Sequence, residues 1–184
     1  MDIYSVGLWA AVAALLCYGF GDFLAAVGVR KVSVTQAMFI QKSFSLCLML
    51  LLVLFVSNYS FSATGLMWGF AGGFVSYMGT FFCYTALKRV PSSIVFPIVN
   101  TCFLWSMILG ILFLGEDVTL LGVLGSLLIF VGTGLASLHG SIRMDREQSL
   151  GIVYALIALF CLGDSFYVWT FFRRFFGPVF GGIL

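Results

Sequence analysis

Charged side chains are scarce in this 184-residue chain. Asp, Glu, Lys and Arg together make up 9% of the residues, whereas 62% are hydrophobic. Soluble domains carry about 25% charged residues, and the few charges here mostly avoid the long apolar stretches. The composition therefore excludes a soluble globular domain and indicates an integral membrane protein whose surroundings are the lipid bilayer.

Residues that commonly build catalytic or metal centres are also few. The single histidine, His139, stands alone after an apolar segment, and no Cys-x-x-Cys pair or nucleotide-binding glycine loop is present. All five cysteines fall inside apolar segments, where cysteine usually acts as a small packing residue: Cys17, Cys47, Cys83, Cys102 and Cys161. We therefore expect no enzyme activity, no metal, no cofactor, no nucleic-acid partner and no direct coupling to ATP.

Long apolar segments fill most of the chain. Each has about 20 residues or slightly more, enough for a helix to cross a hydrocarbon core of about 30 Å. The first segment lacks the basic flank of a cleavable signal peptide, so we expect it to persist as a helix. The sequence predicts an all-α polytopic membrane helix bundle with six spans: Gly7–Val29, Gln36–Val56, Thr64–Leu87, Ser92–Leu114, Val118–Leu138 and Leu150–Phe172.

The sixth span repeats the first. Residues 7–19 and 151–163 are identical at six of thirteen positions, with a constant offset of 144. Because five spans separate the starts of the two copies, the copies run in opposite directions across the bilayer, as in inverted-repeat carriers. We predict a first five-helix repeat over residues 1–144 and the start of a second, inverted repeat over residues 145–184, an organisation that favours transport.

Basic residues gather on one side of the predicted bundle. They follow the first, third and fifth spans, and the positive-inside rule places these loops in the cytoplasm: Arg30, Lys31, Lys88, Arg89, Arg143 and Arg146.

Small residues predict close contacts between helices. In lipid, helices associate through small faces that let backbones approach. The third span contains a doubled G-x-x-x-G, and a second set of small residues repeats its spacing. The glycines expected to pack are Gly65, Gly69 and Gly73 in the third span and Gly122, Gly125 and Gly132 in the fifth, with Gly72, Ser76 and Thr80 as the second set.

A proline inside the fourth span predicts a kink. Pro97 removes a backbone hydrogen bond, and Asn100 in the next turn offers a donor and an acceptor near the exposed carbonyls. Broken backbone at membrane depth is tolerated where it faces protein or a wet cavity. Pro97 and Asn100 therefore either border a substrate route or form a purely structural kink.

Three ionisable residues lie within the predicted spans, where such groups usually face a polar interior. Asp22 and Lys42 are each about 10 Å from the same surface at a rise of 1.5 Å per residue. They either form an ion pair, or Lys42 snorkels to the interface and Asp22 stands alone as a proton-binding carboxylate. Asp164 lies at a comparable depth from the opposite surface, so Asp22 and Asp164 are candidate substrate-binding residues.

Several motifs follow one another between Tyr84 and Gly132. They are Tyr84-Thr-Ala86-Leu87-Lys-Arg-Val90-Pro91-Ser, Phe113-Leu114-Gly115-Glu116, and Leu121-Gly122-x-x-Gly125 with Gly132. This series resembles the EamA-type drug/metabolite transporter superfamily, which has an Ala-Leu-x-x-x-Pro joint, a Phe-Leu-Gly-Glu helix end and a glycine-marked following helix.

The resemblance implies ten helices in two five-helix halves around a cavity that opens alternately to each side. It implies small organic metabolites or drugs as substrates, and it adds Tyr84 and Trp105 as candidate substrate-binding residues by position. It also implies a cytoplasmic N-terminus, opposite to the result of the charge rule. Only the first helix of a second half is present, so we expect a fragment whose partner is the missing C-terminal half.

The leading hypothesis is a secondary transporter for a small-molecule substrate. One alternative is a small-multidrug-resistance-like half-carrier that acts as an oligomer with a second half-carrier. The other is a membrane scaffold subunit that transports nothing, in which neither Asp22 nor Asp164 would have a role.

Overall fold

The computed structural model describes residues 3–53, 63–115, 119–137 and 146–176, which form helices and no strand. The helices are α1 (Ile3–Lys31), α2 (Val34–Val53), α3 (Ala63–Arg89), α4 (Ser92–Asn100), α5 (Cys102–Leu109), α6 (Leu120–Ser137) and α7 (Arg146–Phe176), and a π-helical turn, η1 (Gly110–Leu114), follows α5. Each predicted span coincides with a helix or, for the fourth, with α4, α5 and η1 in series. The all-α helix bundle is thus confirmed.

Three of the described helical segments are long and apolar enough to cross a membrane: Gly7–Lys31, Ser92–Leu114 and Arg146–Val168. Large apolar side chains are exposed over much of the bundle, among them Leu15, Phe39 and Phe70, as expected where lipid replaces water. The protein is an integral membrane protein, and membrane crossing by α2, α3 and α6 stays a prediction.

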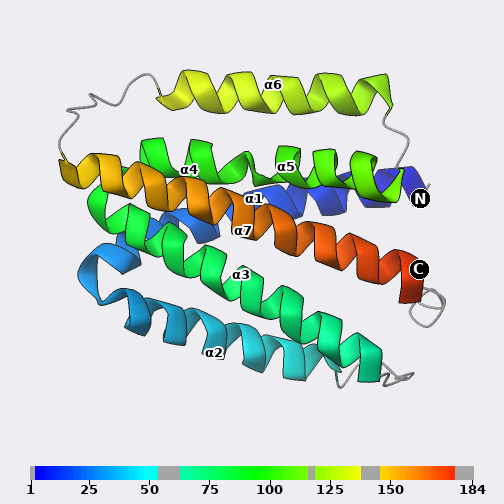
Figure 1. The fold of residues 1–184 in the computed structure, drawn as a ribbon, viewed down its shortest axis with the longest axis horizontal. Coiled ribbons are helices and arrows are strands. Elements are labelled where there is room, and N and C mark those ends of the chain that lie inside the picture. Colours follow the sequence, from blue (N-terminus) through cyan, green and yellow to red (C-terminus); the bar gives the residue numbers. More distant parts are fainter. Residues whose placement is uncertain (1–2, 54–62, 116–118, 138–145, 177–184) are drawn as a thin grey trace.

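The helices lie side by side with α7 in their midst (Figure 1). α7 contacts α3, α4 and α5, α2 packs against α1 and α3, and α6 lies on the outer side of α4. The predicted boundary between residues 144 and 145 lies outside the described residues. The first helix of the predicted second repeat packs with one side against α3, α4 and α5, whereas Val153, Leu156 and Phe166 on this helix are exposed.

α3 and α7 share a seam of small residues. On both helices, buried or half-buried residues follow one another at alternating intervals of four and three residues, the spacing of a coiled-coil interface. These residues are Gly72, Ser76, Gly79, Cys83, Ala86 and Val90 on α3, and Gly151, Ala155, Ala158 and Leu162 on α7. The two helices run antiparallel, because Gly72 approaches Val168, Gly79 approaches Leu162, and Gly151 approaches Val90. A Cβ atom on Gly79 would lie 2.8 Å from Leu162 Cγ, so glycine permits this approach.

Four of the glycines predicted to pack have no close neighbours, whereas Gly72 of the second set approaches Val168. A Cβ atom on Gly69, Gly73, Gly125 or Gly132 would meet nothing within 4 Å, and Gly122 is exposed. The surroundings of Gly65 lie outside what the structure describes. α3 therefore packs through the Gly72 and Gly79 face, and packing of the other glycines stays a prediction.

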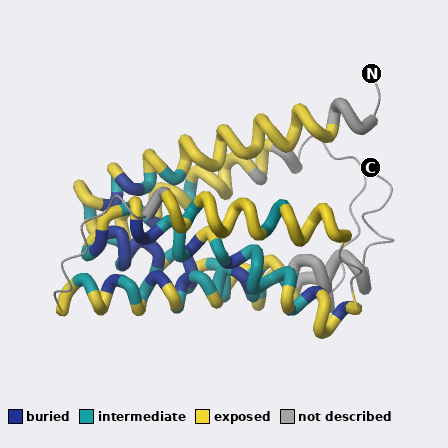
Figure 2. The backbone as a smooth tube through the Cα atoms, turned by 90° about the horizontal axis from the view of Figure 1, so that it is seen from above, coloured by how far each residue is buried: buried dark blue, intermediate teal, exposed yellow. Residues whose placement is uncertain are grey.

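Buried residues gather toward one end of the bundle (Figure 2). At this end Val29 of α1, Met38 of α2 and Leu87 of α3 are each 1% exposed, and Val95 of α4 is fully buried. α1 diverges from the other helices away from that end, and its residues 7–20 are all exposed. The bundle is thus closed where α1 and α3 end, and it opens along the first half of α1.

Candidate functional site

The fourth span breaks one turn after its proline. Pro97 is half-buried within α4, and the helix ends at Asn100 before resuming as α5. The Thr101 hydroxyl donates to the Ile98 carbonyl at 2.6 Å, and the Thr101 amide donates to the same oxygen at 3.2 Å. The interruption lies not at Pro97, which stays within α4, but at Thr101; Thr101 supplies the donor there, and Asn100 is exposed.

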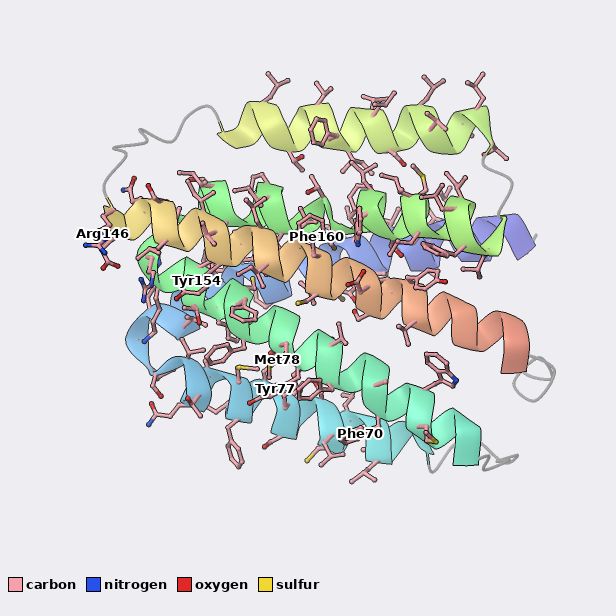
Figure 3. The ribbon with its side chains drawn as sticks, viewed as in Figure 1. Phe70, Tyr77, Met78, Arg146, Tyr154 and Phe160 are labelled. Carbon is pink, nitrogen blue, oxygen red and sulfur yellow. The ribbon has the colours of Figure 1, made fainter. Side chains whose placement is uncertain are left out.

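One turn beyond this break, α5 is hydrogen-bonded to α7. Trp105 Nε1 donates to Asp164 Oδ1 at 2.9 Å in a partly buried setting. The Trp105 ring also meets Phe160 edge to face, with the ring centroids 5.0 Å apart, and Figure 3 shows Phe160 along the middle of α7. The structure thus brings together two predicted substrate-binding residues that are 59 positions apart in the chain.

The approach of α5 to α7 at this point depends on Gly163. A Cβ atom there would lie 2.7 Å from the Cys102 carbonyl oxygen and 2.7 Å from Trp105 Cδ1. Van der Waals contacts of carbon begin well above that distance, at about 3.5 Å. One turn of α7 therefore supplies both the close contact, through Gly163, and the carboxylate, through Asp164.

A second carboxylate lies between α1 and α3. Asp22 is half-buried and lies within electrostatic range of Cys83 and Tyr84. Tyr84 itself is 6% exposed and belongs to the core. Asp22 has no hydrogen bond or ion pair with any residue that the structure describes, so its carboxylate is available to a ligand.

The structure does not pair Asp22 with Lys42. The ion pair between described side chains joins Arg89 Nη1 to Glu147 Oε2 at 3.2 Å, at the end of the bundle where α3 ends and α7 begins. The Arg89 guanidinium also lies 5.2 Å from the centroid of the Tyr154 ring. The two sequence interpretations of Asp22 and Lys42 both stay predictions.

The two carboxylates differ in depth. Trp105 is 13 residues beyond Ser92, and Asp164 is 13 residues beyond Gly151, which contacts Val90. At 1.5 Å per residue both lie about 20 Å from the basic end, whereas Asp22, eight residues before Arg30, lies about 12 Å from it. Asp22 and Asp164 therefore stand on either side of the middle of a core about 30 Å thick.

Acidic side chains within a membrane are costly and usually line routes for ions or substrates. Asp164 accepts a hydrogen bond from Trp105, and Asp22 has no partner among the described residues, so this set suits recognition of a polar or cationic group. In the described part of the chain, no three of His, Cys, Asp and Glu come together to hold a metal. The motif residue Glu116 lies outside the described residues.

Sequence reasoning missed three features of this region: the Thr101 hydrogen bonds, the close approach at Gly163 and the Arg89–Glu147 ion pair. Thr101 carries a weak signal, because its hydroxyl lies within a turn of a helix-interior proline and can bond to nearby carbonyls. The other two depend on the relative heights of helices far apart in the chain.

Comparison with known proteins adds a family. Residues 5–138 match the EamA-like transporter family. A curated relative from Archaeoglobus fulgidus, described as an uncharacterized transporter, is 26% identical over 152 residues, which cover 82% of this chain and 53% of the relative. The chain thus spans about half the length of that relative. No solved structure matches this chain.

Proposed function

Because the chain belongs to the EamA-like transporter family, we propose that it forms part of a secondary transporter that moves a small organic solute by alternating access. The observation that carries this proposal is the hydrogen bond between Trp105 and Asp164, which joins α5 to α7 about 20 Å from the basic end. A carboxylate held at this depth by an aromatic donor is a suitable contact for a solute crossing the membrane.

The binding site we propose lies between the two carboxylates. Asp164 and Trp105 contact the solute from α7 and α5, and Asp22 contacts it from α1, with Tyr84 behind it on α3. The break at Thr101 lies one turn from Trp105, so a small change of angle there shifts the indole relative to Asp164. Hinges of this kind let a site open to one side and then the other.

A second half completes the site in this proposal. On α7 the residues Gly151, Ala155 and Ala158 are buried against α3. Their counterparts at the offset of 144, Gly7, Ala11 and Ala14, are exposed on α1. We propose that this face of α1 receives the helix of a second repeat that corresponds to α3, because the same small-residue face packs that way in α7.

A matched pair of substitutions tests the second-half proposal. Ala155→Leu places a large side chain in the α3–α7 seam and should destabilise the protein by about 1–3 kcal/mol. Ala11→Leu should leave the stability of this chain unchanged, because residue 11 is exposed. Ala11→Leu should, however, weaken binding of a co-expressed polypeptide that carries a second EamA repeat. Equal binding by wild type and Ala11→Leu would remove this face from the proposal.

Transport itself is tested in reconstituted vesicles that contain the protein with such a second half. The probes are labelled amino acids and hydrophobic organic cations. Saturable uptake is expected for at least one probe. Asp164→Asn or Asp22→Asn should lower the affinity for that probe tenfold or more, which corresponds to a loss of about 1.4 kcal/mol of binding free energy. Glu147→Gln is the matched control, since it removes one acidic charge at the surface.

The same experiment separates the alternatives. Uptake by the 184-residue chain alone, together with stable dimers in detergent, would favour the half-carrier. A membrane scaffold would move no probe, and neither Asp22→Asn nor Asp164→Asn would change its behaviour.

A further inference from the structure

A hollow of about 390 Å³ lies at the basic end of the bundle. It is formed where α1 ends and where α3 turns into α4, so helices that are far apart in the chain supply its walls. Its lining residues are Arg30, Leu87, Lys88, Arg89, Val90 and Pro91. It lies nearer the basic end than the proposed transport site, because Asp22 is about 12 Å and Trp105 and Asp164 are about 20 Å deeper along their helices; Tyr84 is the closest residue of that site, one turn of α3 before Lys88.

Two of the three cations in this hollow are unneutralised. Arg30 and Lys88 are exposed and form no ion pair with any residue that the structure describes. Arg89 differs, since it bonds to Glu147 at 3.2 Å and lies over the Tyr154 ring. Among the residues that the structure describes, the one carboxylate that pairs with a lining cation thus engages Arg89, and Arg30 and Lys88 have no described acidic partner.

The rest of the lining favours a ligand with an apolar part. Leu87 is 1% exposed and Val90 is 3% exposed, so they form an apolar base beneath the cations. Val27 and Phe23 precede Arg30 by three and seven residues and therefore share its face of α1; they are 40% and 61% exposed. An apolar strip thus runs from the hollow along the membrane-facing side of α1.

The start of α4 adds to the positive potential. Pro91, at the rim of the hollow, precedes the first residue of α4, and no side chain caps this helix end. The N-terminus of a helix carries a partial positive charge and favours anions. This contribution is small beside the two free cations and has the same sign.

We propose that the hollow binds the phosphate of an anionic phospholipid in the adjoining leaflet, with Arg30 and Lys88 as its cationic contacts and an acyl chain along Val27 and Phe23. The helix ends place these cations at headgroup level, where basic pockets between membrane helices bind anionic lipid headgroups. A soluble phosphate offers the same anion without the chain, so the apolar strip on α1 favours the lipid as its source.

Lipid binding is measured by native mass spectrometry of the protein purified in detergent and titrated with phosphatidylglycerol or phosphatidylcholine. Each Lys or Arg near the surface contributes about 1 kcal/mol to binding of an anionic lipid. Arg30→Gln with Lys88→Gln should therefore weaken phosphatidylglycerol binding about 30-fold, with little change for phosphatidylcholine.

A charge-matched control distinguishes the hollow from a general basic surface. Lys31→Gln with Arg146→Gln removes two positive charges from the same end of the bundle, but neither residue lines the hollow. Because neither residue contacts the lipid in this proposal, the control should weaken phosphatidylglycerol binding less than about threefold, which corresponds to less than about 0.7 kcal/mol. Circular dichroism of both double variants verifies that each retains its helices. A third double variant, Arg30→Lys with Lys88→Arg, keeps both positive charges and should bind phosphatidylglycerol as the wild type does.

Three results would overturn the proposal. Equal losses in the two double variants would reduce the effect to general surface charge. Equal affinity of the wild type for phosphatidylglycerol and phosphatidylcholine would show that the hollow does not recognise the anionic charge of the headgroup. Displacement of bound phosphatidylglycerol by excess inorganic phosphate, with both bound equally well, would assign the hollow to a soluble anion instead.

Discussion

The close approach of α5 and α7 should make Gly163 intolerant even of a methyl group. In Gly163→Ala the new Cβ atom would lie 2.7 Å from the Cys102 carbonyl oxygen and 2.7 Å from Trp105 Cδ1. The carbonyl belongs to the backbone and cannot rotate away, so the two helices must separate. Separation also stretches the hydrogen bond from Trp105 to Asp164.

The size of the effect follows from three contributions. Overpacking a close contact destabilises by about 1–3 kcal/mol, and weakening a hydrogen bond of this kind by up to about 1 kcal/mol. The preference of a helix for alanine over glycine offsets about 1 kcal/mol. We therefore expect Gly163→Ala to lower the free energy of unfolding by about 1–3 kcal/mol.

The assay is unfolding by sodium dodecyl sulfate in mixed micelles, followed by circular dichroism. Gly69→Ala and Gly73→Ala are the controls, because a Cβ atom at either position meets nothing within 4 Å. Each control should leave stability unchanged or raise it by up to about 1 kcal/mol. If Gly163→Ala proved as stable as these controls, the close approach of α5 to α7 would be refuted.

Three further substitutions test separate contacts by the same unfolding measurement. Trp105→Phe keeps an aromatic ring, although a smaller one, and removes the donor to Asp164, so it should destabilise by at least about 1 kcal/mol; an unchanged stability would contradict that bond. Asp22→Asn and Lys42→Met should have additive effects, with a coupling energy below about 0.5 kcal/mol, whereas a larger coupling would restore the ion pair. Arg89→Gln should destabilise by less than about 1 kcal/mol, because its ion pair is exposed, and the difference should shrink at high salt.

The helices were predictable from the sequence because apolar length alone defines them. The described parts of all six predicted spans are almost entirely helical, and no partner has to be known for that inference. The break at Thr101 lies one turn after Pro97 and does not follow from the missing amide, because a proline removes the hydrogen bond of the turn that precedes it. The depths of Trp105 and Asp164 could also be estimated from helix rise, once the contact between Gly151 and Val90 aligns the ends of α3 and α7.

The face through which α3 packs was harder to predict. α3 carries one set of small residues at Gly65, Gly69 and Gly73, which has the G-x-x-x-G spacing, and another at Gly72, Ser76 and Gly79, which is spaced by four and then three residues. The partner decides between them, because α7 presents small residues at alternating intervals of four and three. A search for the same alternation in two spans would have found the seam from the sequence, whereas a motif within one helix could not.

The two copies of the repeated segment separate packing from chemistry. The small residues that they share, such as Ala155 and its counterpart Ala11, form a face suited to close contact, and in α7 this face is buried against α3. The copies also share the glycine of the close approach, Gly163 and Gly19, but the residue that follows is Asp164 in α7 and Phe20 in α1.

This difference makes the proposed site asymmetric. The acidic residue of α1, Asp22, comes two positions later along the helix than the counterpart of Asp164, which turns it by about 200° around the helix axis. Asp22 therefore faces another side of its own helix than Asp164 does. In the proposed carrier, two inverted copies with the same packing face would present their carboxylates to the route in different directions, so a solute would meet a different arrangement of polar groups from each side of the membrane.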